Sequence, residues 1–79
     1  VLDSTEINSV NIYPNPTNSE WNIESLTIIN TVTLLNLLGQ IVIEQTVNDM
    51  KVNIDASNLS TGVYILIVNK TIIKRVSKR

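Results

Sequence analysis

A chain of 79 residues with a net charge of −1 can form one small domain, near the lower size limit for unaided folding. Hydrophobic residues make up 43% of it, which is enough for a core and argues against disorder. The balance of six basic and seven acidic residues excludes the strong positive charge of a typical nucleic-acid or anionic-membrane binder. Cysteine and histidine are absent, which excludes disulfides, thiol catalysis, zinc sites and His-based acid–base catalysis.

The remaining composition favours β-structure. Val, Ile and Thr account for 29 of the 79 residues, and these β-branched side chains suit strands better than helices. No apolar run approaches the ~20 residues that a membrane-spanning helix needs, so we expect no membrane insertion. The chain opens at Val1 without a methionine or a signal-like segment, and we therefore expect it to be a piece of something longer.

The chain order begins with a segment that shows no period. Residues 1–8 carry two acids, and we expect them to be a linker from an upstream cargo protein, followed by one domain over residues 9–79. Alternation of apolar and polar residues then predicts short strands, and Pro14 and Pro16 end the first of them. The predicted strands are residues 10–13, 21–24 (with 26–29 as an extension or a separate piece), 32–37, 41–46, 51–55, 63–68 and 71–77.

Turns separate these strands. Leu38-Gly39-Gln40 predicts a hairpin turn in which Gly39 adopts a positive φ, and Asn48-Asp49 and Asn69-Lys70 predict two further turns. Residues 63–68 are apolar apart from one tyrosine hydroxyl, which is typical of a central strand that is covered on both faces.

Seven short strands at this spacing predict an all-β fold, an immunoglobulin-like antiparallel β-sandwich. The pattern Leu59-x-x-Gly62-x-Tyr64 fits a feature of such sandwiches, in which a tyrosine hydroxyl binds the backbone of the preceding corner. An ordinary half-buried strand tyrosine fits the pattern equally well.

The polar residues offer little chemistry. Glu20 and Glu24 lie on one face of the second strand but ~13 Å apart, too far to act as an acid–base pair. Asp55 and Ser57 have the spacing of a local Asx turn, and a catalytic Asp–Ser pair would need a base that the chain lacks. No calcium-loop spacing occurs either. We therefore expect no catalytic, metal or cofactor site, and no enzyme.

The cations are concentrated at the C-terminal end, at Lys74, Arg75, Lys78 and Arg79. The cluster is short and has no interleaved aromatic residues, which argues against nucleic acid as a partner. Charged residues can keep an edge strand soluble, or they can form an exposed tag that a partner reads electrostatically. The composition does not choose between these two.

Four motifs occur in one order along the chain. They are Ile12-Tyr13-Pro14-Asn15-Pro16-Thr17, Asn36-Leu37-Leu38-Gly39-Gln40, Asp55-x-Ser57-x-Leu59-x-x-Gly62-x-Tyr64 and the basic end. In this order and spacing the chain resembles the type A C-terminal sorting domain of the type IX secretion system of Bacteroidota, over residues 8–79. Two departures are Asn18, where many members have glycine after the proline turn, and Trp21, where members usually have another apolar residue.

The resemblance implies an immunoglobulin-like sandwich that serves as a secretion signal. It implies that an outer-membrane translocon and its shuttle protein read the domain, and that a cell-surface sortase removes it upstream of, or within, residues 1–6. It implies a cargo that reaches the cell surface or the medium by way of the periplasm and the outer membrane. The signal residues carried over by position are Tyr13, Pro14, Asn15, Pro16, Leu38, Gly39, Gln40, Gly62, Val63, Tyr64, Lys74, Arg75, Lys78 and Arg79.

A second hypothesis comes from another class of protein. An immunoglobulin-like accessory module could bind carbohydrate through exposed aromatic rings, for which the chain offers Tyr13, Trp21 and Tyr64.

Overall fold

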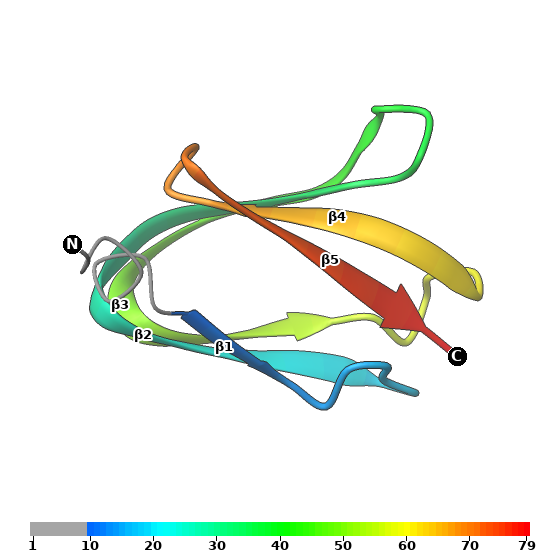
Figure 1. The fold of residues 1–79 in the computed structure, drawn as a ribbon, viewed down its shortest axis with the longest axis horizontal. Helices are drawn as coiled ribbons and strands as arrows, with labels where there is room; N and C mark the ends of the chain where they lie inside the picture. Colours follow the sequence, from blue (N-terminus) through cyan, green and yellow to red (C-terminus); the bar gives the residue numbers. More distant parts are fainter. Residues whose placement is uncertain (1–9) are drawn as a thin grey trace, which may run out of the picture.

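The computed structural model describes residues 10–79, so the predicted linker at residues 1–8 lies outside the described residues. The described chain is all-β, which confirms the predicted fold class (Figure 1). Its strands are β1 (Val10–Tyr13), β2 (Glu20–Leu35), β3 (Ile41–Asp55), β4 (Gly62–Val68) and β5 (Ile72–Lys78). Within residues 10–79, no helix is long and apolar enough to cross a bilayer.

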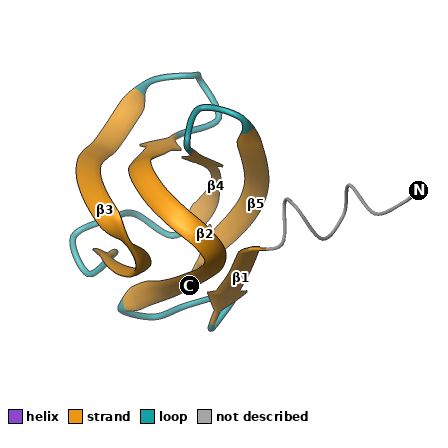
Figure 2. Ribbon diagram, turned by 90° about the vertical axis from the view of Figure 1, so that its left-hand side faces the viewer, coloured by secondary structure: helices purple, strands orange, loops and turns teal. Residues whose placement is uncertain are grey.

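All strand pairs are antiparallel, and the two longest strands bend so that the sheet folds over on itself (Figures 1 and 2). What we call the β1 layer consists of β1, residues 20–24 of β2 and residues 51–55 of β3. The β5 layer consists of residues 31–35 of β2, residues 41–46 of β3, β4 and β5. The two layers enclose the core as in a sandwich, but both belong to one continuous five-stranded sheet.

The predicted number of seven strands is wrong, because two pairs of predicted strands are halves of one strand. Residues 21–24 and 32–35 both belong to β2, and residues 41–46 and 51–55 both belong to β3. The predicted turn at Asn48-Asp49 lies inside β3, where Asn48 has a φ of 60° and the β2–β3 register shifts by a residue. An extra residue in one strand bends both strands without ending them.

The side chain of Asn69, in the β4–β5 turn, also stabilises the bend of β2. Its side-chain oxygen accepts hydrogen bonds from the amides of Asn30 and Thr31, at 2.6 and 3.2 Å, and its side-chain nitrogen donates to the carbonyl of Ile28 at 3.1 Å. Asn69 and Lys70 both have a positive φ and form the predicted β4–β5 turn. The turn therefore also holds β2 where β2 crosses from one layer to the other.

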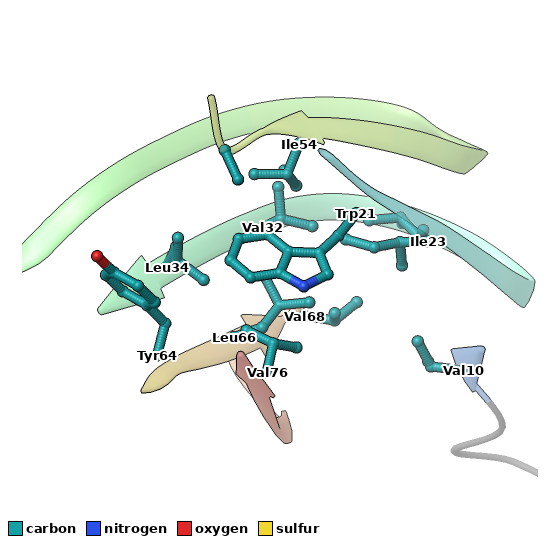
Figure 3. Packing of buried hydrophobic residues seen from close by; sticks show 12 residues of the cluster. Val10, Trp21, Ile23, Val32, Leu34, Ile54, Tyr64, Leu66, Val68 and Val76 are labelled. Atoms are coloured by element: carbon teal, nitrogen blue, oxygen red, sulfur yellow. The ribbon is translucent and has the colours of Figure 1, made fainter. Parts of the chain in front are cut away.

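The core is built around Trp21, whose indole ring is fully buried between the layers (Figure 3). Tyr64 meets it edge to face, with ring centroids 6.2 Å apart. The other fully or nearly fully buried aliphatic residues come from both layers and from the bend between them, and include Ile23, Ile29, Val32, Leu34, Ile54, Leu66, Val68 and Val76.

The sequence predicted that both faces of residues 63–68 are covered, and this is only half correct. Tyr64, Leu66 and Val68 point into the core, while Val63, Ile65 and Ile67 are only half-buried. Among the described residues, no further layer packs on the outer side of β4 (Figure 1). The strand is central in the sheet, between β2 and β5, but its outer face lies at the surface.

The corner between β3 and β4 confirms two local predictions. Asp55 accepts hydrogen bonds from the amide and the hydroxyl of Ser57, at 2.9 and 2.7 Å, and these bonds lower the pKa of Asp55 below its ordinary value. The hydroxyl of Tyr64 donates to the carbonyl of Ser60 at 2.7 Å, so the tyrosine closes the corner that precedes its strand.

Removal of the Tyr64 hydroxyl tests this corner. We expect Tyr64→Phe to lower the free energy of unfolding by about 0.5–1.5 kcal/mol, because the ring packing stays and one hydrogen bond is lost. Urea unfolding of the full chain measures the change. Tyr13→Phe is the matched control: its hydroxyl also donates one hydrogen bond, to Glu24, but at an exposed site, so its loss should change the stability by less than about 0.5 kcal/mol. Equal effects of the two variants would contradict a specific role for the corner.

Candidate recognition site

The four motifs lie together at one end of the domain. The connections at residues 14–19, 36–40 and 56–61 lie at the end of the molecule where β5 finishes, while the bend of β2 and the β4–β5 turn lie at the other end (Figure 1). Their proximity follows from the bend, because β2 and β3 fold back on themselves and so place both of their ends, with the adjoining connections, at the same end of the molecule (Figure 1).

The first motif is bound to the outer edge of β5 by a short ladder of hydrogen bonds. The side chain of Asn15 donates to the carbonyl of Arg75 at 3.2 Å and accepts from the amide of Ser77 at 2.9 Å. The backbone of Thr17 then donates to the carbonyl of Ser77 at 3.0 Å and accepts from the amide of Arg79 at 2.8 Å. We call this the corner–strand contact. It pairs edge groups of a terminal strand that would otherwise be open.

Thr17 is the anchor of this corner. Its side chain is buried, and its hydroxyl accepts hydrogen bonds from the amides of Ser19 and Glu20 and donates to the carbonyl of Glu20. The predicted interruption by Pro14 and Pro16 is confirmed, because β1 ends at Tyr13 and both prolines are exposed. The contact between this corner and the last strand was not predicted, since no local pattern relates residues that are 60 positions apart.

The predicted basic residues differ in exposure, because successive residues of β5 point to opposite sides of the sheet. Arg75 and Arg79 are exposed, Lys74 is half-buried and Lys78 is buried. The Lys78 ammonium donates to the carbonyls of Leu59 and Arg79, at 3.2 and 3.3 Å. An exposed tag made of all four cations is therefore wrong, and Lys78 has a structural contact.

The middle motif forms the predicted turn, with Gly39 at a φ of 85°. The side-chain oxygen of Asn36 accepts from the amides of Leu38 and Gln40, at 2.9 and 3.0 Å, and its nitrogen donates to the Gln40 side chain at 2.9 Å. Leu38 is 83% exposed at the tip. The late motif lies beside the last strand, because Gly62 and Tyr64 of β4 are the antiparallel register partners of Lys78 and Val76 of β5.

No arrangement suited to catalysis is found in the described part of the chain. Residues 10–79 contain no group of three acidic residues that could hold a metal ion. A shallow hollow beside β1 is lined by Asn11, Glu24, Ser25 and Leu26, with a single carboxylate. That carboxylate accepts a hydrogen bond from the hydroxyl of Tyr13, and this bond is the main reason why the pKa of Tyr13 is raised.

The aromatic residues also argue against a sugar-binding platform. Stacking on a sugar needs exposed ring faces, but Trp21 is fully buried and Tyr64 is 7% exposed. Tyr13 is the one aromatic side chain of the three that is exposed, at 46%.

Comparison with known proteins decides the family. Residues 11–79 match the family model described as the secretion system C-terminal sorting domain. This chain is a member of that family. The sorting domain is the export signal of the type IX secretion system, and the protein that carries it is secreted across the outer membrane.

One curated protein and one solved structure are similar to this chain. The sorting domain is 43% identical over 70 residues to the ulvan lyase NLR42 of Nonlabens ulvanivorans, a match that covers 85% of this chain and 13% of the lyase. A solved structure of PorZ, a surface component of the type IX secretion system of Porphyromonas gingivalis, shares the fold with a TM-score of 0.79 at 19% identity. That match covers 96% of this chain and 12% of PorZ. The sorting domain thus corresponds to a small part of both relatives.

The corner–strand contact can be tested by removing one side chain. We expect Asn15→Ala to lower the free energy of unfolding by about 1–2 kcal/mol, because it breaks two hydrogen bonds and exposes the edge of β5. Asn58→Ala, in an exposed position of the β3–β4 corner, is the matched control and should have little effect. If Asn15→Ala unfolds at the same urea concentration as the wild type, the contact does not contribute to the stability of the fold.

Proposed function

We propose that this sorting domain directs an upstream cargo through the outer membrane by presenting a folded surface at the end where its four motifs meet. The shuttle protein and the translocon would read that surface, and a sortase at the cell surface would then remove the domain before or within residues 1–6. The share of the ulvan lyase that the match covers, 13%, supports a cargo that is much larger than the signal. The domain itself is then substrate, not catalyst.

The corner–strand contact is the observation that carries this proposal. Asn15 and Thr17 bind backbone groups of Arg75, Ser77 and Arg79, so the first and last motifs form one surface only when the chain is folded. An unfolded chain would present them separately. Recognition of the folded domain therefore explains why motifs at both ends of the sequence belong to one signal.

The proposed residues divide into two groups by exposure. Tyr13, Pro14, Asn15, Pro16, Leu38, Gln40, Arg75 and Arg79 are exposed and available to a partner. Gly39, with its positive φ, gives the middle turn its shape. Gly62, Val63, Tyr64 and Lys78 lie in the β4–β5 pair, where they position the exposed group. Lys74 is half-buried and belongs to neither group.

A fusion experiment tests the proposal. We expect residues 1–79, fused behind a fluorescent protein with a standard export leader, to release that protein into the medium of a host that has a type IX system. The same fusion in a strain without the translocon should keep the fluorescent protein in the periplasm. Mass spectrometry of the released protein locates any sortase cut. Periplasmic retention in the host with the type IX system would contradict the proposal.

A double variant at the exposed end separates recognition from folding. Arg75→Ala with Arg79→Ala removes both exposed guanidinium groups and leaves the backbone groups that Asn15 and Thr17 bind. We expect less export at unchanged thermal stability. Deletion of residues 75–79 is a poorer test, because it also removes Val76 from the core.

A further inference from the structure

The outer face of the β5 layer is apolar where the outer face of a two-layer protein is normally polar. Side chains that point away from the core form adjacent rows across the paired strands, because register places Leu35 beside Ile65 and Ile67 beside Ile73. Val63 extends the same face on β4. Leu35, Val63, Ile65 and Ile67 are half-buried by their neighbours, and Ile73 is 67% exposed.

The outer face of the β1 layer gives the internal comparison. Its outward positions in β2 and β3 carry Asn22 opposite Asn53 and Glu24 opposite Lys51, and β1 adds Asn11 and Tyr13. This face follows the usual alternation of an antiparallel sheet, apolar inside and polar outside. The contrast within one small domain indicates that the apolar outer face of the β5 layer has a partner.

The charge near this face shows what kind of partner fits. Residues 62–79 contain five of the six basic residues and none of the acidic ones. Arg75 lies beside Ile65 in the outward row, and the exposed Arg79 directly follows the end of β5. Glu44, opposite Thr33, is the one acid that register places on the outer face of the β5 layer. The apolar rows thus have a cationic border along β5.

We propose that the outer face of the β5 layer, centred on Ile65, Ile67 and Ile73, docks on a protein surface of the export machinery that has an apolar centre and carboxylates along one border. This inference rests on the proposed function and adds to it a second contact surface for the same machinery, beside the end where the motifs lie. Apolar contact supplies the affinity, and the carboxylates that face Arg75 and Arg79 set the orientation. A second copy of this chain complements the charge of this face less well, because it offers one carboxylate, that of Glu44, to the two arginines Arg75 and Arg79.

Substitutions at Ile73 test the proposal in the fluorescent fusion. Because Ile73 lies exposed on an edge strand, a polar residue there leaves the core intact. We expect Ile73→Asp to lower the exported fraction by about tenfold or more, since it places a charge on the apolar centre and repels the partner's carboxylates. Ile73→Lys should lower it less. Asn53→Asp, on the polar outer face of the β1 layer, is the matched control and should export as the wild type does.

Four results would overturn the inference. Export of Ile73→Asp at the wild-type level, with the wild type exported, would reject the docking face and leave the proposed function standing. Retention of the wild-type fusion would reject the proposed function and this inference together. A stable dimer of residues 1–79 in light scattering, which Ile73→Asp converts to a monomer, would assign the face to a second copy. If Ile73→Asp lowers the melting temperature of the unfused chain, a loss of export could come from unfolding. The Arg75→Glu fusion then replaces it as the test, and normal export of Arg75→Glu would reject the proposal.

Discussion

The structure depends on a single constraint: backbone groups that a bent or ended strand leaves unpaired must find other partners. Three asparagine side chains supply them. Asn69 holds the bend of β2, Asn36 closes the β2–β3 turn, and Asn15 pairs with the edge of β5. A carboxamide has an acceptor and donors arranged much as a peptide group does, so it can replace a missing strand. This gives a structural reason for three of the eleven asparagines in so short a chain.

Of these three contacts, the one made by Asn15 is the one on which the proposed sorting surface rests. It joins the proline-rich corner to the terminal strand, and that strand in turn pairs with Gly62 and Tyr64 of β4. The first, late and last motifs are therefore parts of one folded surface. The strands also differ in charge. The acidic residues of the strands all lie in β2 and β3, and most of the basic residues lie in or near β5. The domain thus has two different outer faces, and we propose that the apolar and cationic one docks on the export machinery.

The sequence predicted the local features well and the long-range ones poorly. Alternation located the strand segments, Gly39 marked the hairpin, and the spacing of Leu59, Gly62 and Tyr64 anticipated the hydroxyl bond to the Ser60 carbonyl. The seven predicted strands became five because a bend and a turn use the same residue types, and only pairing across the sheet separates them. Burial of Lys78 and the partners of Asn15 depend on contacts with distant residues. The apolar run at residues 63–68 predicted cover on both faces of the strand, but only the side with Tyr64, Leu66 and Val68 lies in the core.

Hydrogen exchange of backbone amides in the full chain tests the central claim most directly. The amides of Ser77 and Arg79 point away from β4, and the corner is their partner. If the corner closes the edge of β5, both amides exchange at least about 100-fold more slowly than in an unfolded chain. Exchange of both at the unfolded rate, while the amides that join β4 to β5 stay protected, would mean that the first and last motifs are independent and that the sorting signal is not one folded surface.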